Sequence, residues 1–335
     1  MRPQHSSGDI LADRRYLYAE GCLADGDFSG AADLAEQALS LAPGYAAAWL
    51  LLGRAREGLF GLDGDPAHRD GARAAYAAAR AADPADALGA GMHLARLGCG
   101  ADPAALSPAY LRTLFDGYAP RFEAHLVDGL HYVGPALLRT ALPAEPAHFA
   151  AALDLGCGTG LMGAAIRDRV GHLGGVDLSP EMLARARAKA VYDRLVTAEL
   201  GAFLAGEPAA SADLCLAADV FIYVADLAPV LREIARVLRP EGLAAFTVQS
   251  PDADAPGAVV GAASGAILGA DGRYAHPDAH LAAAAAGAGL AILTCAAADV
   301  RRERGRPVPG RVAVLRRGHG APHAEIVAPH AGIQT

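Results

Sequence analysis

The sequence predicts an α/β domain that follows an all-α region, and three observations support this prediction. A short apolar run over 150–155 is followed by a turn with three glycines at alternate positions and then by helical spacing. The next apolar run ends in Asp177, nineteen residues after Gly158. Ahead of both runs, residues 12–97 are rich in alanine at helical spacing. We therefore expect a helical domain over 12–97 and an α/β domain over 106–317.

The glycine turn is the element around which the α/β domain is built. Glycines at alternate positions allow a sharp turn and let a ligand lie against bare backbone. A strand, such a turn and a helix are typical of nucleotide-binding α/β folds, in which an acid on the next strand binds the ribose hydroxyls. Asp177 occupies that position. The segment from Gly158 to Gly163 also satisfies the short G-x-G-x-x-G pattern, which by itself leaves a dinucleotide-binding oxidoreductase open.

The remaining elements follow from runs of apolar residues and from helix boundaries. Ser179 and Pro180 are a suitable N-cap and first turn for a helix that extends to about residue 191. A second helix is expected over 227–237, and the LRPEG sequence after it reads as a turn. The uncharged segment 281–298 is mostly alanine and glycine, so we read it as the end of a buried helix, a turn and a strand rather than as a membrane span. The strands are expected over 150–155, 173–176, 195–198, 213–218, 243–248, 290–294 and 311–315.

Three longer strings resemble one enzyme family more specifically than the glycines alone. LDLGCGTG (153–160), GVDLSPEML (175–183) and VLRPEG (237–242) resemble motifs of the class I S-adenosylmethionine-dependent methyltransferases. The resemblance implies a Rossmann-like seven-stranded methyltransferase sheet whose last two strands form an antiparallel edge. It also implies S-adenosylmethionine as the cofactor.

The resemblance implies a set of cofactor-binding residues. The glycine loop would hold the methionine part of the cofactor, with Asp154 near its amino group and Asp177 on the ribose. The third strand ends at Glu199, where an Asp is more usual in the family, and this acid would receive the adenine amino group. The full set is Asp154, Gly156, Gly158, Gly160, Asp177, Leu178, Glu199, Leu200 and Tyr118.

An aromatic segment precedes the core. FDGYAPRFEAHLV (115–127) resembles the segment ahead of the catalytic core in a bacterial group of methyltransferases with N-terminal tetratricopeptide repeats. The resemblance makes Tyr118 and Phe122 candidates for a lid over the cofactor, although core packing of a helix explains them equally well. Arg121 is either a partner of the cofactor carboxylate or a solvated side chain.

Direct displacement at a sulfonium needs alignment above all, and a base only if the acceptor loses a proton. Asp219, at the end of the fourth strand, is the best-placed candidate for that base. Tyr223, Tyr274 and His276 are further candidates, and His276 is expected on a loop. His276 and His280 are four residues apart, but the sequence offers no third metal ligand, so no metal is expected.

The helical region resembles two tetratricopeptide repeats. Two sets of small or aromatic residues, each ending in a proline, have the same internal spacing. The first set is at positions 31, 35, 38 and 43, and the second is at 72, 76, 79 and 84. Trp49, Leu52 and Gly53 match the start of such a repeat. Repeats of this kind present a groove to a peptide or protein, while packing on the neighbouring domain or formation of a homodimer is the alternative.

The composition limits the partners and the compartment. The net charge of −8 argues against nucleic acid as a partner. Five scattered cysteines without a CxxC pair, and the lack of an apolar leader, are consistent with a cytoplasmic protein without membrane insertion. The glycine-rich segment 251–271 is expected to be a lid, and 318–335 a disordered tail.

Three functions stay open at this stage. The first is a methyltransferase that acts on oxygen or nitrogen of an unknown protein or small-molecule acceptor. No N-P-P-Y string follows the fourth strand and no Pro-Cys nucleophile occurs, so adenine, glutamine and cytosine-carbon methylation are not indicated. The second is a non-catalytic interaction protein with a cofactor-sensing domain. The third is an NAD-dependent oxidoreductase.

Overall fold

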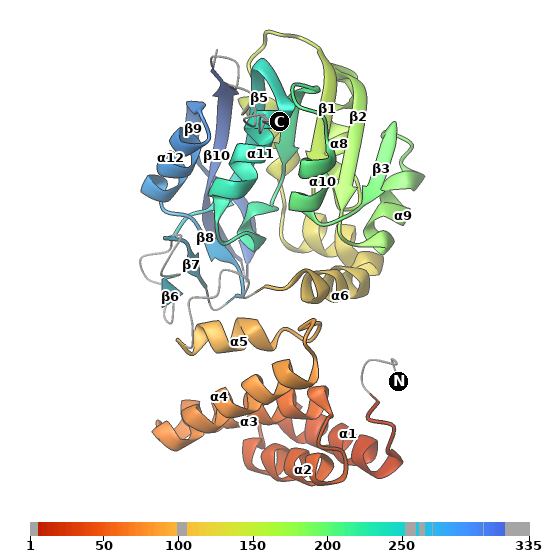
Figure 1. The fold of residues 1–335 in the computed structure, drawn as a ribbon, viewed down its shortest axis with the longest axis vertical. Helices are drawn as coiled ribbons and strands as arrows, with labels where there is room; N and C mark the ends of the chain where they lie inside the picture. Colours follow the sequence, from red (N-terminus) through yellow and green to blue (C-terminus); the bar gives the residue numbers. More distant parts are fainter. Residues whose placement is uncertain are drawn as a thin grey trace, which may run out of the picture.

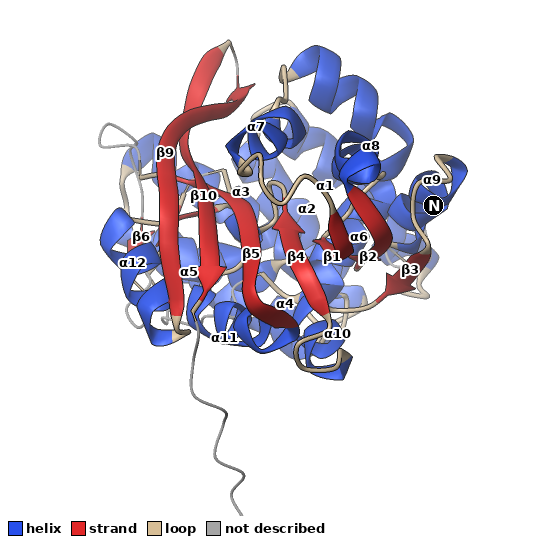
Figure 2. Ribbon diagram, turned by 90° about the horizontal axis from the view of Figure 1, so that it is seen from above, coloured by secondary structure: helices blue, strands red, loops and turns tan. Residues whose placement is uncertain are grey.

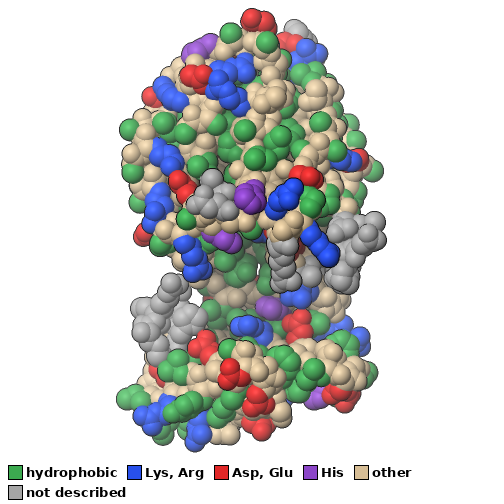
Figure 3. Space-filling model, turned by 180° about the vertical axis from the view of Figure 1, so that it is seen from behind, with side chains coloured by type: hydrophobic (Ala, Val, Ile, Leu, Met, Phe, Trp, Pro, Cys, Tyr) green, Lys and Arg blue, Asp and Glu red, His purple; other side chains and the backbone are tan. Residues whose placement is uncertain are grey.

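The computed structural model shows a helical body and an α/β body (Figure 1). It describes residues 6–98, 106–251, 259–260, 265–269, 271–303 and 305–318. The segment predicted as a lid lies largely outside these residues, and all but the first residue of the predicted tail lies outside them. Seen from behind, the described atoms narrow between the two bodies, and basic and acidic side chains are interspersed on that face (Figure 3).

The helical body confirms the all-α prediction for the N-terminal region. Asp9, Asp27 and Asp65 cap three of its helices by accepting backbone N–H groups. Buried alanines allow close helix crossings, and a Cβ at Gly53 would lie 2.4 Å from the Tyr76 ring. The helices are α1 (Ile10–Ala24), α2 (Phe28–Leu41), α3 (Ala46–Asp63), α4 (Pro66–Ala82) and α5 (Ala90–Arg96).

The α/β body is built on one mixed sheet, which has ten strands in the part of the chain that the structure describes. Five strands are parallel in the order β3-β2-β1-β4-β5, and β10 pairs antiparallel with both β5 and β9 (Figure 2). The predicted antiparallel edge is therefore confirmed. The seven expected strands are β1 (Phe149–Leu155), β2 (Val170–Asp177), β3 (Arg194–Thr197), β4 (Ala212–Ala217), β5 (Leu238–Gln249), β9 (Leu290–Glu303) and β10 (Arg306–Arg317).

Three two-residue strands raise the count above the expected seven. They are β6 (Val259–Val260), β7 (Ile267–Leu268) and β8 (Tyr274–Ala275), and β8 joins the end of β5 through the pair Gln249 and Ala275. The LRPEG sequence, expected as a turn, is instead the start of β5. Glu241 takes a left-handed φ of 65° there, and the register between β4 and β5 shifts over the same residues.

Helices cover both faces of the sheet (Figure 2). One apolar core lies between the sheet and α10 (Leu200–Gly206), α11 (Leu227–Val237) and α12 (Asp278–Gly287). A second core lies on the opposite face, under α7 (Gly134–Ala141) and α8 (Leu161–Ile166). The helix α9 (Pro180–Ala188) contacts β2 and β3 at the edge. The segment 281–298 forms the end of α12, a turn and the start of β9, as predicted, and no helix of the described residues is long and apolar enough to span a membrane.

The helix α6 (Pro108–Tyr118) lies where the two bodies meet (Figure 1). Ser107 caps it, and the short helices η2 (Ala119–Arg121) and η3 (Ala124–Gly129) continue the chain past Pro120. Met92 and Ala95 of α5 belong to one apolar cluster with Leu111 of α6 and Tyr274 of β8. The helical body is therefore packed against the segment that also borders the site described next.

Candidate active site

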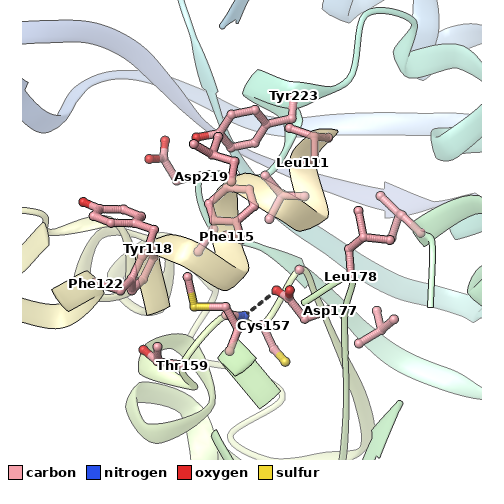
Figure 4. A pocket seen from close by; sticks show the side chains of 18 of the residues that line it. Leu111, Phe115, Tyr118, Phe122, Cys157, Thr159, Asp177, Leu178, Asp219 and Tyr223 are labelled. Atoms are coloured by element: carbon pink, nitrogen blue, oxygen red, sulfur yellow. Dashed lines mark hydrogen bonds between the residues drawn. The ribbon is translucent and has the colours of Figure 1, made fainter. Parts of the chain in front are cut away.

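A cavity of about 670 Å³ lies at the carboxyl ends of β1, β2 and β4 and is closed on the other side by α6 (Figure 4). The strand order changes direction between β1 and β4. In open α/β sheets ligands bind at such a switch point, beyond the carboxyl ends of the strands. The volume falls within the usual range for a pocket that holds a small-molecule ligand.

The glycine loop forms one wall of the cavity with bare backbone. Gly156, Gly158 and Gly160 have φ values of 65°, 54° and 90°, which favour glycine. A Cβ at Gly156 would clash with Val220, at 2.6 Å. A Cβ at Gly158 would meet only Phe122, at 3.9 Å, so it would occupy the cavity itself. The loop thus leaves open volume beside Gly156 and Gly158, which is consistent with a ligand against its backbone.

Asp177 at the end of β2 joins the loop to the cavity. Its Oδ2 accepts the Gly158 N–H at 2.8 Å, shown as the dashed line in Figure 4, and its Oδ1 accepts the Ser179 N–H at 2.8 Å. Burial raises the pKa of the carboxyl, while these N–H groups oppose the shift. Each oxygen keeps a lone pair for another donor. Asp177 can therefore brace the loop and bind hydroxyl groups at the same time.

Asp154 does not line the cavity. It is 1% exposed, and Tyr192 donates a hydrogen bond to its Oδ2 at 2.6 Å, while its Oδ1 has no partner among the described residues. Burial raises the pKa of this carboxyl to about 7. The structure therefore encloses Asp154 beside Tyr192 and not on the cavity wall, and its role beside a cofactor amino group stays a prediction. Gly160 also lies outside the cavity lining, against Tyr192 and Lys189.

Glu199, Leu200 and Leu178 line the cavity on the side of β3. Glu199 is the N-cap of α10, and its Oε2 accepts the Ala202 N–H at 2.8 Å. Its other oxygen has no hydrogen bond from the described residues. The structure therefore brings these three predicted residues to the same end of the cavity as Asp177.

Aromatic side chains from α6 and the segment after it cover the glycine loop (Figure 4). Tyr118 and Phe122 both line the cavity and meet edge to face, with their ring centroids 5.1 Å apart. The Tyr118 hydroxyl is hydrogen-bonded to His125 Nδ1, and Arg121 lies over the Tyr118 ring. Phe115, which the sequence did not single out as a ligand contact, lines the cavity between the loop and Tyr223.

A hydrogen bond fixes this cover to the loop side. Ser179 is fully buried, and its Oγ donates to Asp116 Oδ1 of α6 at 2.6 Å. Lys189 after α9 pairs with Glu123 at 2.8 Å. The aromatic cover is therefore tied to the turn that carries Asp177 and to the end of the neighbouring helix.

Asp219 lies on the opposite side of the cavity, after β4. It takes a left-handed φ of 60°, and its N–H donates to Thr247 Oγ1 at 2.8 Å. Arg301, which is 2% exposed, donates to Asp219 Oδ1 at 2.8 Å and to Gln249 Oε1 at 2.6 Å. Burial raises the pKa of Asp219, and the Arg301 charge opposes that shift. The Asp219 carboxylate is thus ion-paired with Arg301, and a hydrogen bond to Thr247 holds its backbone.

Tyr223 and Arg273 complete this side of the cavity. The Tyr223 ring meets Phe115 edge to face at 5.3 Å, and burial raises the pKa of its hydroxyl. Arg273 lines the cavity and pairs with Glu303, which also accepts from Arg301 Nε at 3.0 Å. Asp219, Arg301, Glu303 and Arg273 therefore form one continuous charged network.

His276 lies between β8 and α12 outside regular secondary structure, as expected, but it does not line the cavity as a catalytic side chain would. It is fully buried, its Nε2 lies 2.9 Å from the Phe221 carbonyl oxygen, and its Nδ1 lies 3.3 Å from His280. Burial lowers its pKa to about 4, so the ring is neutral near pH 7. Tyr274 is likewise buried and packs in the apolar cluster between the two bodies. The described residues contain no cluster of three or more His, Cys, Asp or Glu side chains suited to a metal.

The sequence reasoning missed Arg273, Arg301, Glu303 and Tyr132. Arg301 lies 82 residues after its partner Asp219, in β9, so no local motif joins the two. Tyr132 stands twenty-two residues before Asp154 in a segment without helical or strand periodicity. Only the folding of β9 and of segment 130–133 against the site brings these side chains together.

The match to known proteins falls on the part of the chain that forms this site. Residues 153–246 match the family model described as "Methyltransferase domain". A malonyl-[acyl-carrier protein] O-methyltransferase of Enterobacter lignolyticus is 34% identical over 140 residues, which cover 41% of this chain and 53% of that protein. Methyltransferase-like protein 27 of Homo sapiens is 41% identical over 92 residues, 26% of this chain and 37% of that protein. This chain thus spans about half or less of these relatives.

Two solved structures with a similar fold carry methyltransferase names, and another is named as a [4+2]-cyclase. An S-adenosylmethionine-dependent methyltransferase from Mesorhizobium loti has 24% identity and a TM-score of 0.41, and covers 54% of this chain and 96% of that chain. A methyltransferase in complex with the Haloferax volcanii activator Trm112 has 22% identity and a TM-score of 0.47, and covers 61% and 98%.

The domain match and the strand order define the class of the α/β body. Its strand order is Rossmann-like, and residues 153–246 within it are similar to a methyltransferase domain.

Proposed function

We propose that the chain is an S-adenosylmethionine-dependent methyltransferase whose acceptor is an oxygen or nitrogen atom on a molecule with an apolar body. One observation carries the proposal: the open glycine loop and Asp177 share a single cavity with Asp219 and with an apolar wall from α6. That wall and its surroundings are formed by Leu106, Pro108, Leu111, Leu114, Phe115, Val224 and Ala225.

The chain's own residues bind and orient the donor in this proposal. The backbone of Gly158, which has no side chain, contacts the cofactor. Asp177 accepts hydrogen bonds from the two ribose hydroxyls. Glu199 and Leu200 hold the adenine end. The bound cofactor supplies a methyl group on a positively charged sulfonium, which is a good electrophile. Among the described residues that line the cavity, four carboxylates (Asp177, Glu199, Asp219 and Asp226) outnumber the two guanidinium groups (Arg121 and Arg273), which favours a cationic ligand.

Alignment and exclusion of water are the main catalytic contributions. Phe115, Tyr118 and Phe122 cover the loop and keep water away from the reacting atoms. Asp219 and Tyr223 border the acceptor side, where Asp219 orients the acceptor and takes a proton if the acceptor carries one. Arg301 stabilises the ionised form of Asp219, and an ionised carboxylate can accept a hydrogen bond or a proton from an acceptor that carries an O–H or N–H group. The names of several relatives, malonyl-[acyl-carrier protein] O-methyltransferases, favour oxygen as the acceptor atom.

Because the helical body resembles tetratricopeptide repeats, we propose that it binds a partner protein. Formation of a homodimer is the alternative. Helix α5 packs on the cluster that includes Leu106 and Leu111, which also line the cavity. A partner bound there would therefore lie near the acceptor side. A cytoplasmic location remains a prediction.

Two measurements on the purified full chain test the proposal. Isothermal titration should show binding of S-adenosylmethionine and S-adenosylhomocysteine and none of NAD, because NAD binding would instead support the oxidoreductase alternative. Transfer of a labelled methyl group from the donor to a cell extract, followed by separation of protein from small molecules, should identify the acceptor fraction. Cofactor binding without transfer would support the alternative of a non-catalytic cofactor sensor.

A further inference from the structure

Tyr132 borders the cavity and carries a hydroxyl group that has no hydrogen-bond partner among the described residues. Its side chain is partly buried and lines the cavity. Within the described part of the chain, no protein group forms a hydrogen bond with its Oη. The described polar atoms that are both fully enclosed and without a partner do not include this oxygen. The hydroxyl is therefore left without a protein partner on a side chain that borders the cavity.

The backbone around Tyr132 is held in place by three hydrogen bonds. The Leu130 carbonyl accepts the Arg302 N–H at 2.7 Å, the Val133 N–H donates to Val300 at 3.0 Å, and the Tyr132 N–H donates to Leu126 at 3.1 Å. Two of these partners flank Arg301 in β9. The strand that positions Asp219 through Arg301 therefore also positions the segment that carries Tyr132.

Gly134 provides the space that the Tyr132 ring occupies. A Cβ at Gly134 would lie 2.5 Å from the Tyr132 Oη and 2.6 Å from the ring carbons Cε2 and Cζ. Such distances are not tolerated between real atoms, so any side chain at this position would displace the phenol.

The phenol is a hydrogen-bond donor at all ordinary pH values. Burial raises the pKa of Tyr132 above its usual range, and the nearby carboxylates of Asp219 and Asp154 raise it further. The charge of Arg301 opposes the effect of these carboxylates. A protonated hydroxyl at this point suits a ligand that presents a hydrogen-bond acceptor, and the strongest such acceptor is a carboxylate.

We propose that the Tyr132 hydroxyl donates a hydrogen bond to a carboxylate oxygen of a ligand bound in this cavity. The inference rests on the proposed function, in which two ligands offer that group: the amino-acid end of the cofactor, and an acceptor that carries a carboxylate. The chemistry of recognition is the same for both, and affinity measurements distinguish them.

The test compares two nucleosides on the purified full chain by isothermal titration. S-adenosylhomocysteine carries the amino-acid carboxylate, whereas 5′-methylthioadenosine has the same adenosine and a thioether but no carboxylate. If the cofactor is the ligand, Tyr132→Phe should weaken S-adenosylhomocysteine by roughly ten- to a hundredfold and leave methylthioadenosine within about twofold. If the acceptor is the ligand, both affinities stay unchanged, and the apparent KM for labelled methyl transfer into an extract fraction rises by a similar factor.

Two further variants keep the result interpretable. Gly134→Ala should reproduce the effect of Tyr132→Phe, because its methyl group displaces the phenol while the hydroxyl remains. Tyr110→Phe removes a partly buried hydroxyl outside the cavity whose partner is the Met92 sulfur, 4.0 Å away, and it should leave every value unchanged. The inference is wrong if Tyr132→Phe alters neither affinity nor KM, or if it weakens both nucleosides equally. Failure of the parent chain to bind S-adenosylhomocysteine would instead refute the proposed function.

Discussion

The role of Asp177 gives the most direct test of the cofactor site. Asp177→Ala removes a carboxylate that would accept hydrogen bonds from both ribose hydroxyls and that already accepts the Gly158 and Ser179 N–H groups at 2.8 Å. A hydrogen bond to a charged group contributes about 1.5–3 kcal/mol, so the loss of two corresponds to at least about 3 kcal/mol, or roughly a hundredfold in affinity. Release of the Gly158 anchor adds to this loss.

Isothermal titration with S-adenosylhomocysteine measures this effect, and a second carboxylate serves as the matched control. Asp193 also accepts a backbone N–H, from Leu173 at 2.7 Å, and it pairs with Arg167 outside the cavity. Asp193→Ala should lower thermal stability but keep the affinity within about twofold of the parent. Because burial raises the pKa of Asp177, affinity in the parent should fall as the pH is lowered through that raised pKa. An Asp177→Ala affinity within about threefold of the parent would refute the reasoning.

Three further predictions concern stability and catalysis. Asp154 has a pKa of about 7 in the folded chain against 3.8 ordinarily, so its burial makes the parent less stable as pH rises between these values. The free energy of unfolding of Asp154→Asn in urea, relative to that of the parent, should therefore increase by roughly 2–3 kcal/mol between pH 5 and pH 8. A difference that does not depend on pH would contradict this. His276 has a pKa of about 4 in the folded chain against 6.5 ordinarily, so the parent should lose roughly 3 kcal/mol of stability as pH falls between these values. His276→Gln should lose less stability over that range and keep methyl transfer. Loss of methyl transfer in this variant would instead support a catalytic role for His276. Arg301→Met leaves Asp219 buried and unpaired, so it should lower the free energy of unfolding by about 3–5 kcal/mol. The double variant Asp219→Asn/Arg301→Met should recover most of this loss. Additive effects of the two substitutions would show that the pair is not coupled.

The seven main strands and the helices between them could be predicted because each depends on a local pattern. A buried parallel strand needs a short apolar run, and a helix needs a cap and a period of 3.6 residues, as at Ser179 and Pro180. The boundaries were less accurate. The expected LRPEG turn is part of β5, since its geometry depends on pairing with β4 and β10, which lie elsewhere in the chain.

The cofactor side of the site was also predictable, because its residues lie within a few positions of strand ends. The sequence places Gly158, Asp177 and Glu199 after three neighbouring strands, and parallel strands bring their carboxyl ends to one edge. The structure brings all three to one cavity. Asp154 shows the limit of this reasoning, because the direction of a side chain at the end of a strand depends on what packs beside it, here Tyr192.

The sequence by itself determined a Rossmann-like α/β domain with a glycine loop and a partnering acid, behind a region of helices. Only the tertiary structure decided the acceptor side. Arg301 and Arg273 reach Asp219 and Tyr223 through β9 and the β8 hairpin, Tyr132 faces the cavity because of Gly134 and the backbone of β9, and His276 is enclosed. The physical reason is the range of the interactions: turn and strand preferences act over a few residues, whereas a buried charge or phenol finds its partner through contacts that are distant in sequence.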